Sequence, residues 1–158
     1  MNLLLDVGNT RIKWRAWQAG RLLPGGALRH DEFLTALAGA QVITTVPQRV
    51  LIACVGHEAL RQDLQQLVAD RFGLAAEFFL ASAQAGGIRN AYAEPERLGV
   101  DRWLALRAAR RYVGGPVLVV DAGSALTLDV LTAAGHHAGG LIVPGLDMMQ
   151  SSLFSGTG

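Results

Sequence analysis

The sequence contains little cysteine, few aromatic residues and almost no excess of charge. Cys54 is the only cysteine among 158 residues, so the chain cannot form an internal disulfide. Its place in the apolar segment from Val50 to Val55 predicts a small buried side chain. Aromatic residues make up 6% of the chain and the formal net charge is +1. Nucleic-acid-binding proteins normally carry a clustered basic excess, so the composition argues against that class of function.

Long apolar runs are also absent from the sequence. No uninterrupted hydrophobic segment is long enough to span a bilayer, and the first one, without a basic leader, reaches an aspartate at position 6. We therefore expect a soluble, cytoplasmic protein that does not engage a membrane. Hydrophobic residues make up 51% of the chain and the mean hydropathy is +0.28, which suffices for the core of one domain or of two small ones.

The spacing of apolar residues predicts a mixed α/β fold. Alternation over 10–17, with Ile12 and Trp14 on one face and Lys13 on the other, indicates a half-buried strand. Apolar runs and helical spacing extend the pattern to three strands, a helix, a strand, a helix, a strand and a helix. The expected strands lie near 3–6, 10–17, 22–28, 50–55 and 77–80. Asp31 is the expected N-cap of the first helix, and the other two helices begin near Glu58 and at Asp101.

One pattern occurs twice: an apolar run ends in an aspartate, one residue, a glycine and a small polar residue. The first copy holds Asp6 and Gly8, and the second holds Asp121 and Gly123. A strand that delivers a carboxylate to a glycine turn is a common way to hold phosphate and its metal, because backbone N–H groups can approach the oxyanion. Either aspartate alone could simply accept hydrogen bonds from its own turn. The repetition favours a phosphate site.

The second copy begins like the first and then stops. Alternation resumes over 126–131, a glycine turn follows, and an amphipathic stretch runs from Leu146 to Leu153. If the duplication is genuine, the second copy lacks its later strands and helices, which leaves a strand edge and an apolar face uncovered. We therefore predict two halves, 1–116 and 117–158, and a chain that continues beyond Gly158 in the intact gene.

Several polar residues could carry chemistry. Lys13 could reach phosphate oxygens held at the first turn, although a solvated strand face explains it equally well. Tyr92, Asp101 and Arg102 combine a phenol, a carboxylate and a guanidinium, which suits a small hydroxylated acid. Asp101 could instead cap its helix while Arg102 is solvated. His136 and His137 would point to opposite faces of a strand, and no third metal ligand accompanies them.

Three motifs stand in order along the chain. The first, Asp-x-Gly-Asn-Thr-x-x-Lys, comprises Asp6, Gly8, Asn9, Thr10 and Lys13. The second, Gly-x-Asp-Arg, comprises Gly99, Asp101 and Arg102, with Tyr92 upstream. The third, Asp-x-Gly-Thr-Ala-x-Thr-x-Asp, comprises Asp121, Gly123, Ser124, Ala125, Thr127 and Asp129, with serine at the usual threonine, and it continues to Gly139, Gly140, Pro144 and Gly145. Together they resemble the type III pantothenate kinases, a family that is also similar to the Bvg accessory factor proteins.

The resemblance implies an actin-like kinase fold of two ribonuclease H-like halves, a homodimer, and ATP-dependent phosphorylation of pantothenate, the first step of coenzyme A biosynthesis. It also implies a role for each matching residue. ATP phosphates and magnesium would contact Asp6, Val7, Gly8, Asn9, Thr10, Arg11, Ile12 and Lys13, with magnesium on Asp6, and Ser124 would contact ATP. Pantothenate would contact Tyr92, Gly99, Val100, Asp101 and Arg102, with Asp101 as general base, and Asp121 would bind potassium or ammonium.

Two other classes of function remain open at this point. A noncatalytic transcriptional regulator could keep the fold without the reaction, although it would have no physical need for so many costly charged residues. An actin-like phosphatase or sugar kinase would share the phosphate turns but not the segment from Gly99 to Arg102. The family also has a C-terminal part that completes the second half and the adenosine site, so we expect weak or no activity from residues 1–158 alone.

Overall fold

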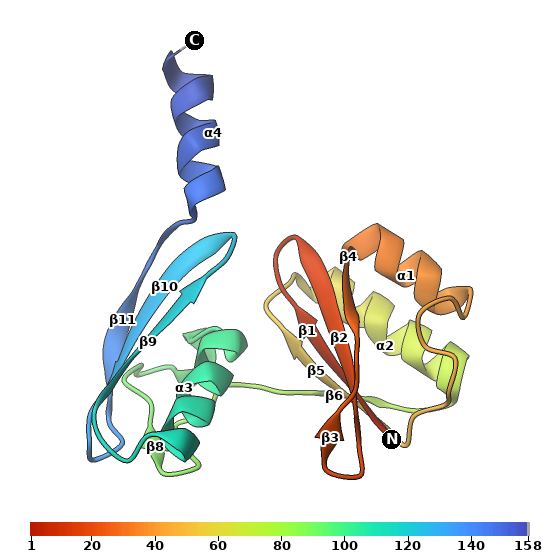
Figure 1. The fold of residues 1–158 in the computed structure, drawn as a ribbon, viewed down its shortest axis with the longest axis horizontal. Helices are drawn as coiled ribbons and strands as arrows, with labels where there is room; N and C mark the ends of the chain where they lie inside the picture. Colours follow the sequence, from red (N-terminus) through yellow and green to blue (C-terminus); the bar gives the residue numbers. More distant parts are fainter. Residues whose placement is uncertain (158) are drawn as a thin grey trace. The chain divides into compact units, whose positions relative to one another are not determined.

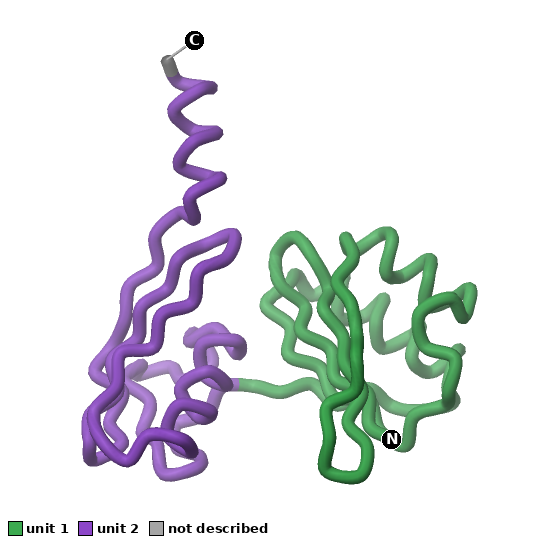
Figure 2. Tube along the Cα trace, in the orientation of Figure 1, with its two compact units in different colours: residues 1–80 green, residues 81–158 purple. Residues whose placement is uncertain are grey.

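The computed structural model describes residues 1–157, which form two compact units (Figures 1 and 2). Unit 1 is Met1–Leu80, and unit 2 begins at Ala81. Contacts within the chain define these units, whereas the predicted halves 1–116 and 117–158 follow the duplicated motif. The boundary at 116/117 therefore stays a prediction about topology.

Unit 1 is a mixed sheet with two helices (Figure 1). Its strand order is β3-β2-β1-β5-β6, with β4 also paired to β2; β2 runs antiparallel to β1, and β5 runs parallel to it. The predicted third strand is split in two around Pro24, and the other predicted elements are confirmed. The elements are β1 (Asn2–Val7), β2 (Arg11–Gln18), β3 (Arg21–Leu22), β4 (Gly26–Arg29), α1 (His30–Ala38), β5 (Arg49–Cys54), α2 (Glu58–Phe72) and β6 (Ala76–Phe78).

The core of unit 1 fixes which face of β1 is polar. Leu3, Leu5 and Val7 alternate along the strand and are 0–3% exposed, and they pack with side chains of α1 and α2. Full burial of each such side chain contributes about 1.5–3 kcal/mol relative to exposure. Because strand side chains alternate between faces, Asp6 and its register partner Lys13 lie on the opposite face. Cys54 is 1% exposed, which confirms the prediction of a buried thiol.

The start of α1 differs from the sequence-based expectation. Asp31 is not the N-cap residue; α1 begins at His30, and Arg29 occupies the N-cap position. The Arg29 backbone N–H donates to Glu32 Oε2 at 3.0 Å. The Glu32 carboxylate thus accepts from the backbone N–H of the N-cap residue, as the third-position glutamate of a capping box does. At the C-terminal end of α2, Gly73 is the cap residue and adopts the left-handed conformation, with φ 67°, as expected.

Unit 2 places a helix against a three-stranded antiparallel sheet of order β11-β10-β9 (Figure 1). Trp103 and Leu106 of the helix are buried with Leu131 of the sheet and with Ile88 and Leu98. No helix in residues 1–157 is long and apolar enough to cross a membrane. The elements are β7 (Gln84–Ala85), β8 (Ile88–Arg89), a 3-10 turn (Pro95–Arg97), α3 (Val100–Tyr112), β9 (Val117–Ala122), β10 (Ala125–Leu131), β11 (His137–Pro144) and α4 (Leu146–Thr157).

The sheet of unit 2 has an open edge and exposed apolar residues. Within the described chain β9 pairs with β10 alone, whereas its counterpart β1 has a strand on each side. Leu118 and Val120 of β9 are 54% and 53% exposed. Helix α4 extends beyond the end of β11 (Figure 1), and its Leu146 and Phe154 are 75% and 81% exposed. The free edge and the uncovered apolar residues expected from the sequence are thus both present.

Candidate active site

The first glycine turn joins β1 to β2 and carries an exposed ion pair. Lys13 Nζ lies 3.4 Å from Asp6 Oδ2, with side chains 68% and 49% exposed. Exposed pairs of this kind contribute little to stability, because water and salt screen them. A phosphate group could therefore replace Asp6 as the partner of Lys13, or a cation could replace Lys13 as the partner of Asp6, at small cost in free energy.

The backbone of this turn is tied to the following helix. The Gly8 N–H donates to the Arg11 carbonyl at 3.0 Å, and the Gly8 carbonyl lies 2.8 Å from His30 Nε2. A carbonyl oxygen only accepts, so Nε2 of His30 carries a proton. His30 was not predictable from the sequence, because the pairing of β4 with β2 brings position 30 beside the turn from 22 residues away in the chain.

Besides Asp6, Gly8 and Lys13, the residues of the first turn assigned to phosphate binding fall into two groups. Val7 and Ile12 are 0% exposed and belong to the core, so only their backbone can contact a ligand. Asn9, Thr10 and Arg11 have exposed side chains at the tip of the turn or at the start of β2. The turn thus offers backbone groups flanked by exposed polar side chains.

The second glycine turn, between β9 and β10, is not a copy of the first. Three residues separate the paired Ala122 and Leu126, whereas four separate Val7 from Ile12. As a result Asp121 faces Thr127 in the register, and no lysine stands opposite it. The Asp121 and Ser124 side chains are both exposed. The second turn therefore offers oxygen atoms without a fixed positive charge opposite its aspartate.

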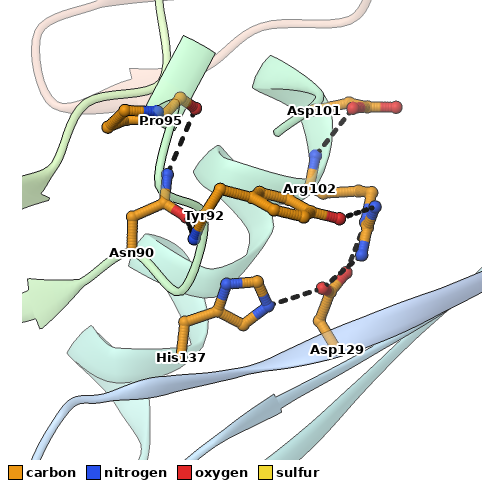
Figure 3. A network of polar contacts seen from close by, with 7 residues as sticks. All are labelled: Asn90, Tyr92, Pro95, Asp101, Arg102, Asp129 and His137. Atoms are coloured by element: carbon orange, nitrogen blue, oxygen red, sulfur yellow. Dashed lines mark hydrogen bonds and ion pairs between the residues drawn. The ribbon is translucent and has the colours of Figure 1, made fainter. Parts of the chain in front are cut away.

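The residues that the family resemblance assigns to substrate binding lie at the start of α3 and in the loop before it (Figure 3). Arg102 donates from Nε and Nη2 to the two carboxylate oxygens of Asp129, at 2.8 and 2.6 Å. Both side chains are almost fully buried, 5% and 2% exposed. The hydrogen bonds that Arg102 donates to Asp129 raise the pKa of the Arg102 guanidinium, against the opposing effect of burial. The alternative of a solvated Arg102 is therefore wrong.

Two further residues complete this cluster. His137 Nε2 lies 2.8 Å from Asp129 Oδ1, and the Tyr92 hydroxyl oxygen lies 3.4 Å from Arg102 Nη1. Asn90 fixes the loop before the helix: its side chain accepts from the Tyr92 N–H and donates to the Pro95 carbonyl. His137 was not predicted as a site residue; the pairing of β11 with β10 brings it to Asp129, and its side chain is buried on an otherwise largely exposed strand.

Asp101 points away from the Arg102 guanidinium (Figure 3). Its Oδ1 accepts from the Arg102 backbone N–H at 2.8 Å, and Gly99, rather than Asp101, occupies the N-cap position of α3. A Cβ added to Gly99 would overlap Asp101 Oδ1. Glycine at position 99 therefore leaves room for the carboxylate of Asp101.

The predicted residues thus form separate groups. The turn at Asp6 belongs to unit 1, whereas Tyr92, Arg102 and the turn at Asp121 belong to unit 2. Among residues 1–157, no group of three or more His, Cys, Asp or Glu side chains could hold a metal ion.

One solved structure is similar over almost the whole chain. It is a Campylobacter jejuni protein assigned to the Baf family of transcriptional activators, with a TM-score of 0.58 and 23% identity over 98% of this chain and 60% of that chain. At this identity the likeness shows a shared mixed α/β fold, and it carries no argument about regulation or catalysis.

Comparison by sequence is more specific. The family model for type III pantothenate kinase matches residues 2–158. Curated type III pantothenate kinases from Nitrosococcus oceani and from Azoarcus sp. are 43% and 44% identical over 97% and 99% of this chain. In both cases the chain spans 60% of the relative's length. The chain belongs to the type III pantothenate kinase family.

Proposed function

We propose that the complete gene product transfers the γ-phosphoryl group of ATP to the hydroxyl of pantothenate and so begins coenzyme A biosynthesis. The observation that carries this proposal is the separation of two opposite charges at the start of α3. Arg102 is paired with Asp129, and the Asp101 carboxylate points elsewhere (Figure 3). Asp101 is therefore left to take a proton, while a neighbouring guanidinium orients an anionic group.

The first turn would hold the phosphates of ATP. Phosphoryl transfer depends mainly on positioning and on neutralising charge. Backbone N–H groups of residues 9–11 and the exposed Lys13 ammonium can do both. Magnesium commonly binds one or two carboxylates together with substrate phosphates, so a single exposed carboxylate at Asp6 fits such an ion, which when bound neutralises phosphate charge.

The second turn would hold the monovalent cation. Asp121 supplies an exposed carboxylate without a cationic partner in the strand register, and hard cations such as potassium take oxygen ligands. Ammonium could use the same oxygens as acceptors. Ser124, at the tip of this turn, would donate its hydroxyl to ATP.

Pantothenate would lie at the start of α3. Asp101 is the proposed general base for the substrate hydroxyl, and Tyr92 and Arg102 would bind the acid group. Val100 is 5% exposed, so it would contribute its backbone, as would Gly99.

We also propose the remaining features that the family resemblance implies. These are a homodimer, a cytoplasmic location and two ribonuclease H-like halves, 1–116 and 117–158. The order β3-β2-β1-β5-β6 and the antiparallel start β9-β10-β11 support a duplicated topology. A buried, unpaired Cys54 is compatible with a reducing compartment.

A substrate panel tests the proposed reaction. The complete gene product, supplied with ATP, magnesium and potassium or ammonium, is expected to phosphorylate pantothenate and to leave sugars unmodified, as followed by ADP release and mass spectrometry of the product. Absence of pantothenate phosphorylation, with ATP and pantothenate both unbound in calorimetry, would reject the kinase and favour a noncatalytic protein. Phosphorylation of a sugar instead would favour a sugar kinase.

Substitution of Gly8 by alanine tests the phosphate turn. A Cβ at Gly8 would meet only the Arg11 carbonyl oxygen, at an ordinary 3.5 Å, so the variant should fold normally. A phosphate that approaches the backbone closely would clash with that methyl group. We expect the KM for ATP to rise about 10-fold or more, a loss of about 1.4 kcal/mol in binding.

The matched control is Gly114→Ala, because a Cβ added at Gly114 would meet no atom within 4 Å. It should leave the KM for ATP and the unfolding temperature unchanged. An unchanged KM for ATP in Gly8→Ala would contradict the proposal that this turn binds the phosphates of ATP.

A further inference from the structure

The Arg102 guanidinium is held along one edge. Nε and Nη2 donate to Asp129 at 2.8 and 2.6 Å, whereas Nη1 has one long contact among the described residues, 3.4 Å from the Tyr92 hydroxyl oxygen. A guanidinium carries five N–H donors in a rigid plane. Fixing one edge of that plane therefore fixes the direction of the donors on Nη1, and these donors are incompletely used.

His137 holds Asp129 from the opposite side (Figure 3). Its Nε2 lies 2.8 Å from Asp129 Oδ1, and its side chain is 0% exposed. A carboxylate oxygen only accepts, so Nε2 is the donor; Nδ1 has no partner among residues 1–157. The His137 ring also stands edge-on to the Tyr92 ring, with centroids 6.1 Å apart. One imidazole therefore contacts both side chains that flank the Arg102 guanidinium.

Gly140 provides the space for this arrangement. It pairs with Asp129 in the β10–β11 register. A Cβ at Gly140 would overlap Asp129 Oδ1, the Leu128 carbonyl oxygen and Arg102 Nη2. Gly139, next to it, has open space around the position of a Cβ. The close approach of β11 to the ion pair thus requires glycine at position 140.

Stability alone does not account for a buried ion pair. Removing two charges from water is costly, and apolar residues of similar size often serve stability as well or better. A buried bidentate pair does fix geometry. Because Asp129 also neutralises the charge of Arg102, recognition by Arg102 depends on where its remaining donors point.

We propose that Asp129, His137 and Gly140 are positioning residues that direct the Nη1 edge of Arg102 toward the Tyr92 hydroxyl. This edge and the hydroxyl together receive the anionic group of the substrate. The inference rests on the proposed binding of pantothenate at the start of α3, and it goes further by assigning three residues of β10 and β11 to the orientation of a single guanidinium.

Two substitutions in the complete gene product test the proposal by kinetics. His137→Leu removes the donor to Asp129, and Gly140→Ala inserts a methyl group against the ion pair. Each should raise the KM for pantothenate about 10-fold, while kcat and the KM for ATP change by less than about two-fold. His137→Gln, whose side-chain amide can donate to Asp129, should restore most of the pantothenate KM. Gly114→Ala is the neutral control.

A spectroscopic measurement tests the same proposal without activity. In the parent protein the Arg102 Nε–H resonance, assigned by its loss in Arg102→Lys, should exchange slowly with water because this group donates to a buried carboxylate. The slow exchange should be lost in His137→Leu and Gly140→Ala and kept in His137→Gln.

The two measurements separate the possible failures. If the parent protein does not phosphorylate pantothenate, the proposed function fails, and the resonance still decides whether His137 and Gly140 orient Arg102. If His137→Leu and Gly140→Ala keep both the slow exchange and the parental KM for pantothenate, the positioning proposal is wrong. A fall in kcat with unchanged pantothenate KM would also contradict it.

Discussion

Replacing Asp101 by asparagine is expected to reduce kcat by about 10²–10⁴-fold, the usual contribution of a general base. The amide has nearly the same shape as the carboxylate but cannot take the proton of the pantothenate hydroxyl. Its oxygen can still accept the 2.8 Å hydrogen bond from the Arg102 N–H, so α3 should keep its start. Steady-state kinetics of the complete gene product measures the effect.

The control for this variant is Asp63→Asn, which removes an exposed carboxylate on α2. It should leave kcat unchanged. The KM for ATP and the unfolding temperature should stay at parental values in both variants. Parental kcat in Asp101→Asn would show that another group accepts the proton.

The largest expected effect on stability is that of Asp129→Leu. This substitution leaves the Arg102 guanidinium buried without its carboxylate, and breaking a buried pair in this way typically costs about 3–5 kcal/mol. The complete gene product should therefore unfold at a clearly lower temperature. Adding Arg102→Met to Asp129→Leu should recover much of the loss, because the double variant buries no charge.

Glu77→Gln is the matched control, because Arg49 and Glu77 form the same bidentate pair, at 2.8 and 2.6 Å, on the surface. Its effect should be small. The hydrogen bonds from Arg49 lower the pKa of Glu77, so this pair stabilises the fold above the unfolded pKa of Glu77 and loses that effect as the pH falls through the folded pKa. An unfolding temperature of Asp129→Leu equal to that of Glu77→Gln would contradict burial of the Arg102 pair.

The sequence predicted the strands and helices well where the apolar pattern was regular. Alternation in β2 placed Ile12 in the core and Lys13 on the polar face, and helical spacing together with Gly73 defined α2. Local capping was less predictable: Arg29, rather than Asp31, occupies the N-cap position of α1, and Glu32 accepts a hydrogen bond from the Arg29 N–H. Several residues near a helix start can serve as the N-cap, and tertiary context selects among them.

The candidate site was predictable where a motif carried it. Asp6, Lys13, Asp101 and Arg102 came from spacing and family resemblance. The two histidines of the site were not predictable: His30 reaches the Gly8 carbonyl through the pairing of β4 with β2, and His137 reaches Asp129 through the pairing of β10 with β11. In β10 the apolar pattern also obscured the site: Val130 is 44% exposed, whereas Asp129 is 1% exposed.

The two ion pairs described above differ in how they experience dissolved salt. Charges exposed to water are screened over about 8 Å at physiological ionic strength, whereas buried pairs are screened much less. The Asp6–Lys13 pair is exposed and the Arg102–Asp129 pair is buried. Electrostatic attraction of a ligand to the first turn therefore weakens as the ionic strength rises, while the guanidinium at the start of α3 keeps its orientation.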